Sequence, residues 1–256
     1  MSHRLPMPAL TSAQMAEVDR LMVEEFGIEL IQMMEQAGQR LAEQARRMLG
    51  GDLAGRWILV TSGGGNNGGG GLVAARNLHN HGAQVAVEIS TAPQALGSVP
   101  GQHWRTLNQM GLGLADFGPA QADLIIDALV GYGLRGQPTP ALAARIDRLN
   151  SSGRPILALD VPSGLNATTG AAAEACIRAA TTLTLALPKM GLLVEAARPY
   201  VGELVLADIG VPPALYRALG LEVGPIFSKA DIIPAGWNTD GKASLRRRRP
   251  RPSRLS

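Results

Sequence analysis

The chain has 256 residues, of which 46% are hydrophobic and 18% charged, so one large domain with a substantial core is expected. No apolar run approaches the roughly 20 residues of a membrane span, so no membrane partner is expected. Seven basic residues and no acidic one lie from position 242 onward, so the remainder is mildly acidic and does not favour a nucleic-acid partner. The single cysteine, Cys176, excludes an internal disulfide and a multi-cysteine zinc site, and indicates a reducing compartment such as the cytoplasm; we interpret it as a buried thiol rather than a nucleophile.

Helical periodicity comes first along the chain. Ser12 is the expected N-cap of a helix whose apolar residues recur at helical spacing as far as Met22. Gly27 interrupts the pattern, and a second amphipathic stretch runs from about Glu29 to Met48. The methionines of these stretches predict core packing or burial at a dimer interface rather than an exposed interaction surface.

From Arg56 the pattern changes to strands that alternate with helices, which predicts a mainly parallel sheet covered on both faces. Residues 1–228 are expected to form this domain, and residues 229–256 a basic, disordered tail. Buried strands are predicted at 56–61, 84–89, 123–128, 155–160, 181–187 and 203–207, and helices at about 69–81 and 139–150.

The strongest functional signal is the glycine-rich stretch from Ser62 to Gly71, SGGGNNGGGG, which follows the first strand. Glycines let backbone N–H groups approach an anion, and a helix N-terminus adds partial positive charge, so a phosphate or pyrophosphate is the expected ligand. The spacing matches neither the Walker motif nor a clean dinucleotide fingerprint. A tight turn is the alternative, but a turn needs one or two glycines, not seven in ten residues.

Two further motifs follow later strands. Asp127 opens DALVGYGLRG, and Asp160 opens DVPSGLNATTG. Ligands of open α/β sheets bind beyond the carboxyl ends of strands, so both motifs should face the first glycine loop. Partial desolvation would suit Asp160 to proton exchange, and its alternative role is to cap the following turn. Arg135 and Lys189 either contact phosphate or are solvated.

Five ordered segments, GGGNNGGGG, DALVGYGLRG, DVPSGLNATTG, PKMG and GELVLADIGVP, resemble the motifs of the NAD(P)H-hydrate epimerase family over about residues 10–215. The resemblance implies an α/β fold, a Rossmann-like three-layer αβα sandwich with two N-terminal helices. It implies an isomerase of metabolite repair that interconverts the R and S forms of NADHX and NADPHX, nicotinamide cofactors damaged by hydration. It also implies a cytoplasmic homodimer that works with a separate NAD(P)H-hydrate dehydratase.

The resemblance further implies a site. One potassium ion per subunit would be bound by oxygen atoms of Asn67, Asp127 and Ser163, as suits a hard cation. Asp160 would protonate the leaving C6 hydroxyl and then assist the return of water to either face of the flat cation. The nucleotide would contact Asp160 and two runs, Asn66, Asn67, Gly68, Gly69 and Gly70, and Gly131, Tyr132, Gly133, Leu134, Arg135, Gly136 and Gln137.

Two positions depart from the family pattern. The Asp of the family's GGDG is Gly70 here, and the Asp of its GLDADTG is Asn166. The loss of a carboxylate at Gly70 leaves a second hypothesis open, a catalytically impaired nucleotide-binding relative. We predict from this pattern that Gly70→Asp would raise epimerase activity; a neutral or harmful result would argue that the site has adapted to glycine.

A third hypothesis is an NAD-dependent dehydrogenase, which requires an acidic residue at the end of the second strand, where Glu88 lies. No His or Lys stands out as a hydride-transfer partner. The four histidines, His3, His79, His81 and His103, form no metal-ligand pattern and are expected at the surface.

Overall fold

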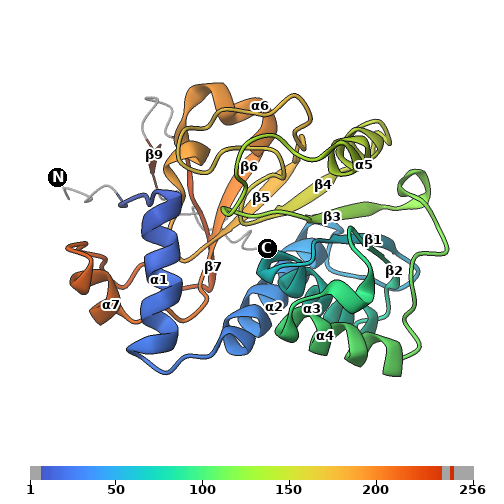
Figure 1. Ribbon diagram of the computed structural model, residues 1–256, viewed down its shortest axis with the longest axis horizontal. Helices are drawn as coiled ribbons and strands as arrows, with labels where there is room; N and C mark the ends of the chain where they lie inside the picture. Colours follow the sequence, from blue (N-terminus) through green and yellow to red (C-terminus); the bar gives the residue numbers. More distant parts are fainter. Residues whose placement is uncertain (1–6, 238–242, 245–256) are drawn as a thin grey trace, which may run out of the picture.

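A seven-stranded sheet forms the centre of the protein in the computed structural model, which describes residues 7–237 and 243–244 (Figure 1). The strand order is β2-β1-β3-β4-β5-β6-β7, and only β7 runs antiparallel to its neighbour. The strands are β1 (Trp57–Ser62), β2 (Gln84–Ile89), β3 (Leu124–Ala128), β4 (Ile156–Leu159), β5 (Thr181–Leu185), β6 (Glu203–Ala207) and β7 (Ile232–Pro234), and β8 (Gly236–Trp237) pairs separately with β9 (Ala243–Ser244).

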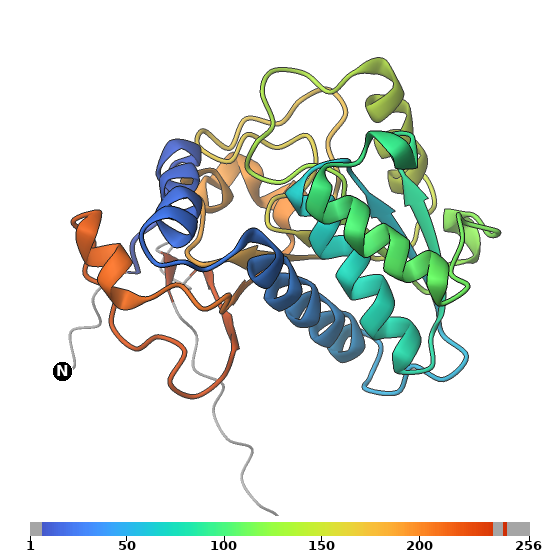
Figure 2. The ribbon, with the colours of Figure 1, turned by 60° about the horizontal axis from the view of Figure 1, so that its bottom comes forward.

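Helices cover both faces of this sheet. On one face, α2 (Leu30–Met48), α3 (Asn66–Asn80) and α4 (Ser98–Gln109) lie side by side (Figure 2) and bury residues such as Ile58 of β1. On the other face, α5 (Pro140–Asn150) packs in a cluster with Leu59. Successive residues of β1 thus point into opposite layers. The predicted three-layer αβα sandwich with a mainly parallel sheet is confirmed.

The N-terminal helix α1 (Ser12–Glu24) packs against the short helix α7 (Pro213–Ala218). Its N-cap is Thr11, whose hydroxyl accepts a hydrogen bond from the backbone of Gln14 at 3.1 Å, so the prediction that Ser12 is the cap was wrong by one residue. The remaining short helices are α6 (Arg198–Val201), η1 (Pro93–Ala95), η2 (Pro119–Gln121), η3 (Met190–Leu193) and η4 (Glu195–Ala197).

Several elements were not predicted, among them α4, α7 and β7. Helix α4 carries a proline and a glycine near its start, and α7 is too short to show periodicity. Strand β7 extends the sheet past residue 228, where the domain was expected to end. The basic segments 238–242 and 245–256 of the expected tail lie outside the described residues. None of the described helices is long and apolar enough to span a membrane.

The strand order places the crevice in which a ligand would bind. From β1 the chain passes to β2 on one side and then to β3 on the other side of β1. The segments that follow β1 and β3 therefore diverge at a topological switch point, where open α/β sheets bind their ligands. Both glycine-rich motifs lie at this point.

Candidate functional site

The segments after β1 and β3 touch at the carboxyl end of the sheet. The N–H of Gly63 donates to the carbonyl of Ala128 at 3.0 Å. A Cβ placed on Gly63 would lie 1.9 Å from the carbonyl oxygen of Leu129, so this contact requires glycine. The two glycine-rich motifs are brought together as predicted.

The glycine-rich stretch is mostly helix rather than loop. Helix α3 begins at Asn66, three residues earlier than predicted, and the four glycines from Gly68 to Gly71 are buried within it. A Cβ on Gly69 would lie 2.4 Å from Met34 Sδ in α2, and one on Gly71 would lie 2.6 Å from Ala128 Cβ in β3. These glycines let α3 pack closely on α2 and the sheet. The anion-binding argument therefore rests on the backbone around Gly65, Asn66 and Asn67 at the start of α3.

Asp127 and Ser163 form a buried pair, as the motif order predicted. The Ser163 hydroxyl donates to Asp127 Oδ1 at 2.6 Å, and its backbone N–H donates to Asp127 Oδ2 at 2.8 Å. Burial raises the pKa of Asp127 to about 6, and the hydrogen bonds from Ser163 and Leu129 oppose that rise. A carboxylate this deeply buried gains from a nearby positive charge.

Asn67 and Asp160 face each other across Gly131. A Cβ on Gly131 would lie 2.9 Å from Asn67 Oδ1 and 3.1 Å from Asp160 Oδ2. The neighbouring backbone N–H, that of Val130, donates to the Ser163 hydroxyl at 2.9 Å. The loop after β3 thus joins the start of α3, Ser163 and Asp160 in one cluster.

Asp160 follows β4 in a left-handed backbone conformation, with φ +68°. Only two non-glycine residues of the described chain have positive φ, and the other, Ala186, lies just after the neighbouring strand β5. This conformation costs free energy, about 1–3 kcal/mol, and is a feature of residues whose side chains are held for function. Oδ1 of this carboxylate pairs with the ammonium of Lys189.

Lys189 is completely buried and pairs with Asp160, so the prediction that it contacts phosphate or solvent was wrong. Its Nζ also donates to the carbonyl of Leu185 at 2.8 Å and to the hydroxyl of Thr184 at 3.4 Å. The segment around Lys189 is fixed on its other side by a parallel bridge to Leu10, which precedes α1. The Asp160 carboxylate thus has a buried cationic partner.

Tyr132 connects the cluster to α1. Its backbone N–H donates to Asp160 Oδ2 at 3.2 Å, and its hydroxyl donates to Asp19 Oδ2 at 2.5 Å. Burial raises the pKa of both Asp19 and Tyr132. Sequence reasoning missed Asp19, because a single carboxylate on an amphipathic helix carries no signal of its own.

The outer part of the second motif lies nearer the surface. Gly133, Arg135, Gly136 and Gln137 are exposed, and Leu134 is partly buried. Gln137 Oε1 accepts a hydrogen bond from the backbone of Glu174 at 3.3 Å. Contact of these residues with a nucleotide stays a prediction.

The sequence matches a known protein family over much of its length. Residues 30–191, more than half of the chain, match the family model described as YjeF-related protein N-terminus. The chain belongs to this family.

Relatives support the assignment to the YjeF-related N-terminal family and the resemblance to NAD(P)H-hydrate epimerases. A protein named NAD(P)H-hydrate epimerase from Dehalogenimonas lykanthroporepellens is 43% identical over 83% of this chain and 86% of its own length. One of the same name from Lentilactobacillus buchneri is 35% identical over 79% of this chain and 94% of its own length.

Longer relatives and a solved structure also match. The bifunctional NAD(P)H-hydrate repair enzyme Nnr of Moorella thermoacetica is 40% identical over 82% of this chain, which spans only 42% of that enzyme. The crystal structure of yeast ynu0 (YNL200c) superposes with a TM-score of 0.74 at 23% identity, covering 89% of this chain and all of the yeast chain. The latter likeness confirms the fold.

Within this YjeF-related domain, Gly70 is a packing position rather than a gap in the site. A Cβ on Gly70 would lie 2.9 Å from Cδ2 of Leu159, the last residue of β4, and 3.8 Å from Ala37 Cβ. The Leu159 side chain therefore occupies the space into which a longer side chain at position 70 would extend.

His103 is buried, so the prediction that all four histidines lie at the surface was wrong. It lies on α4 with Nδ1 3.7 Å from Glu35 Oε1 of α2, and Glu35 in turn pairs with Arg76 of α3 at 2.5 Å. This cluster ties the three helices of one layer together. His79 and His81 lie at the exposed end of α3, and His3 lies outside the described residues.

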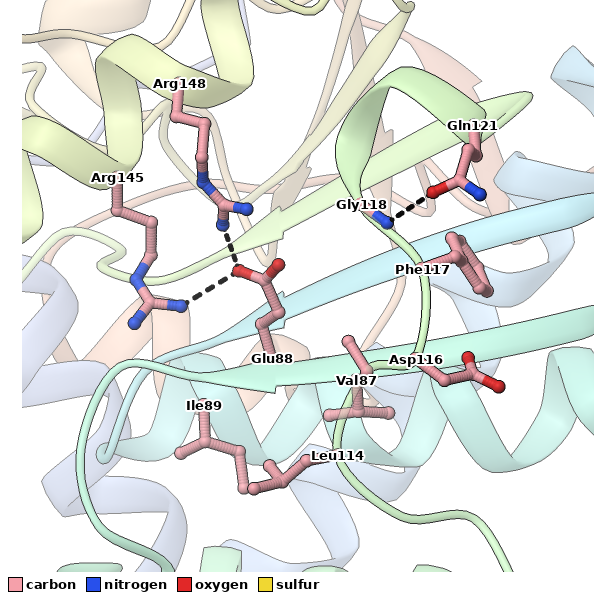
Figure 3. Close-up of a pocket in the computed structure, with 11 residues that line it drawn as sticks. Val87, Glu88, Ile89, Leu114, Asp116, Phe117, Gly118, Gln121, Arg145 and Arg148 are labelled. Atoms are coloured by element: carbon pink, nitrogen blue, oxygen red, sulfur yellow. Dashed lines mark hydrogen bonds and ion pairs between the residues drawn. The ribbon is translucent and has the colours of Figure 1, made fainter.

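Glu88, the residue that a dehydrogenase would need, is already paired. It lines a cavity of about 440 Å³ whose residues include none of the predicted site. Figure 3 shows Arg145 and Arg148 of α5 converging on Glu88, and Arg145 reaches its Oε2 at 3.0 Å. A carboxylate held by two guanidinium groups is not free to bind a ribose, which removes the main support for the dehydrogenase hypothesis.

Proposed function

We propose that this protein is an NAD(P)H-hydrate epimerase that interconverts the R and S forms of NADHX and NADPHX. The observation that carries the proposal is the buried pair of Asp160 and Lys189 beside the crevice where Asn67 and Gly131 meet. Relatives that match over nearly their whole length bear the same name.

Asp160 and Lys189 can share one proton. In this proposal Asp160 takes the proton from Lys189 before it acts as an acid, which leaves both side chains neutral and creates no net charge in the pair. Asp160 then donates this proton to the C6 hydroxyl, which leaves as water while the ring-nitrogen lone pair stabilises the flat cation. Water adds to either face, Asp160 accepts its proton, and that proton returns to Lys189, so the pair regains its starting state.

The nucleotide phosphates belong at the start of α3. The backbone around Gly65 to Asn67 opens a 15-residue helix, whose N-terminus attracts anions. The loop from Gly131 to Gln137 would form the other wall of the crevice. Gly68, Gly69 and Gly70 are buried within α3, so contact of the nucleotide with these three residues stays a prediction.

A potassium ion would fit beside Asp127. The expected ligands supply an amide oxygen from Asn67, a carboxylate from Asp127 and a hydroxyl from Ser163, which are oxygen donors of the kind hard cations prefer. Asp127 is fully buried. A bound cation would supply the positive charge that this carboxylate lacks and would hold the three loops together.

We further propose that the protein works as a cytoplasmic homodimer beside a separate dehydratase, as the resemblance implies, and that residues 1–228 with β7 form the catalytic domain. No membrane or nucleic-acid partner is part of the proposal.

The test uses a mixture of R- and S-NADHX with an S-specific dehydratase and its nucleotide cofactor. The dehydratase alone leaves R-NADHX to drain by slow spontaneous epimerisation. Added protein should accelerate recovery of NADH, measured by its near-ultraviolet absorbance, and Asp160→Asn should abolish the acceleration. No acceleration, together with nucleotide binding by calorimetry, would show a binding protein instead.

A further inference from the structure

Asp19 approaches the candidate site from α1, a helix that supplies none of the predicted site residues. It lies on α1, 113 residues before Tyr132, whose hydroxyl donates to Asp19 Oδ2 at 2.5 Å. Its neighbours on the helix, Met15, Val18 and Met22, are buried in the cluster that includes α7. The carboxylate is therefore presented from a well-packed helix rather than from a mobile loop.

Tyr132 carries this contact to Asp160. The same residue that bonds Asp19 through its hydroxyl donates its backbone N–H to Asp160 Oδ2 at 3.2 Å. Tyr132 is flanked by Gly131 and Gly133, which leave the backbone many conformations. Without an anchor on its ring, that N–H would spend less time on the carboxylate.

The electrostatic surroundings support the same connection. Burial raises the pKa of Asp19, the charge of Asp160 raises it further, and Lys189 and the Tyr132 hydrogen bond lower it. Burial and the charge of Asp19 raise the pKa of Tyr132, so its hydroxyl keeps the proton that it donates. Asp19, Tyr132, Asp160 and Lys189 thus form one interacting group.

We propose that Asp19 is a positioning residue of the epimerase reaction, because through the Tyr132 hydroxyl it holds the Tyr132 backbone N–H on Asp160. This inference rests on the proposed function. The bond leaves Asp160 Oδ2 oriented toward the crevice while Lys189 binds Oδ1. Asp19 itself does not contact the reacting atoms.

The experiment compares Asp19→Ala, Tyr132→Phe and the double variant in the coupled assay. Both single variants remove the same hydrogen bond, so each should lower kcat by about 10- to 100-fold. The KM for NADHX should change less than about threefold, since orientation of the catalytic carboxylate affects the transition state more than binding. The double variant should be no slower than the slower single variant.

Two further variants separate positioning from folding. Asp19→Asn keeps an oxygen that can accept from Tyr132 and should restore most of kcat. Glu17→Ala, on the same helix, removes only an exposed ion pair with Arg20 and should leave kcat unchanged. Melting temperatures of all variants report whether α1 stays folded.

Each outcome has one meaning. If Asp19→Ala retains the kcat of an active wild type, or if the two single losses multiply in the double variant, the positioning role is wrong. If Asp19→Asn is as slow as Asp19→Ala at an unchanged melting temperature, the hydrogen bond is not what matters and the role is again wrong. If the wild type itself shows no epimerase activity, the proposed function fails first and this role fails with it.

Discussion

The ammonium of Lys189 and the carboxylate of Asp160 pair inside the protein. Asp160 directly follows β4, and Lys189 comes four residues after the neighbouring parallel strand β5. Both side chains are almost completely shielded from water. Removal of either charge leaves the other buried without a partner in a medium of low dielectric constant, so stability and chemistry depend on the same pair.

Lys189→Met should therefore both unfold the protein more easily and abolish epimerisation. Loss of one partner of a buried pair costs about 3–5 kcal/mol of unfolding free energy. The double variant Asp160→Asn, Lys189→Met has no unpaired buried charge. Its unfolding free energy, measured in urea, should therefore exceed that of the single variant Lys189→Met. A single variant as stable as the wild type would contradict the burial of this pair.

Gly131→Ala should disturb the site directly. Its new Cβ would lie 2.9 Å from Asn67 Oδ1 and 3.1 Å from Asp160 Oδ2, so one of these groups must move. We expect kcat to fall by at least about tenfold, as misplacement of catalytic groups costs rate. Gly133 has nothing within 4 Å of an added Cβ, so Gly133→Ala should be milder. Equal losses in the two variants would argue that loop flexibility, not the close contact, matters.

Gly70→Asp should destabilise the protein rather than raise its activity. The new side chain would meet Leu159 Cδ2 at 2.9 Å and would bury a carboxylate beside apolar groups. Leu159→Ala opens that space, so Gly70→Asp should be less destabilising in a Leu159→Ala background than in the wild type. Thermal melts of the four proteins measure this coupling. A stable, more active Gly70→Asp single variant would instead support the expectation drawn from the family pattern.

Local patterns predicted the sheet well and the site only in outline. The strands 84–89 and 203–207 have the predicted bounds, because apolar, β-branched runs define buried strands. The start of α3 was missed, because glycine disfavours helix by about 1 kcal/mol and only packing against α2 and the sheet offsets that cost. Local patterns do not record such tertiary contacts.

It was easier to predict which residues belong to the site than to predict which of them contact one another. Asp127 and Ser163 came from ordered motifs, and the structure joins them. Lys189 reaches Asp160 only because β4 and β5 are neighbours, and Asp19 reaches Tyr132 only because α1 packs beside the crevice. These contacts follow from topology, which a single sequence does not specify.

Cys176 should be nearly inert in the native protein. Burial raises the pKa of its thiol to about 12, and the charge of Asp127 adds to the rise. Because thiolate is the reactive form, alkylation at mildly alkaline pH should be about 1,000-fold slower than in urea. Mass spectrometry of iodoacetamide-treated protein measures this rate. Rapid native labelling would place the thiol at the surface.

His103 should make the protein less stable in mild acid. Burial lowers its pKa in the folded state, so the unfolded chain binds a proton more readily. The contribution of His103 to stability is therefore complete above the unfolded pKa of about 6.5 and is lost as pH falls below it.

The neutral variant His103→Gln isolates this effect. The unfolding free energy is measured at about pH 7.5 and at about pH 5.5. Its decrease between these two pH values should be smaller in the variant than in the wild type. Equal losses would assign the acid sensitivity to carboxylates instead.

The left-handed backbone at Asp160 sets two demands against each other at one position. Glycine would relax the main chain there but would remove the carboxylate and leave Lys189 without its partner. The residue that best fits the backbone at position 160 is therefore not a residue that can exchange a proton with the substrate. Asn tolerates the left-handed backbone but has no charge, so Asp160→Asn removes the carboxylate without changing the backbone preference at this position.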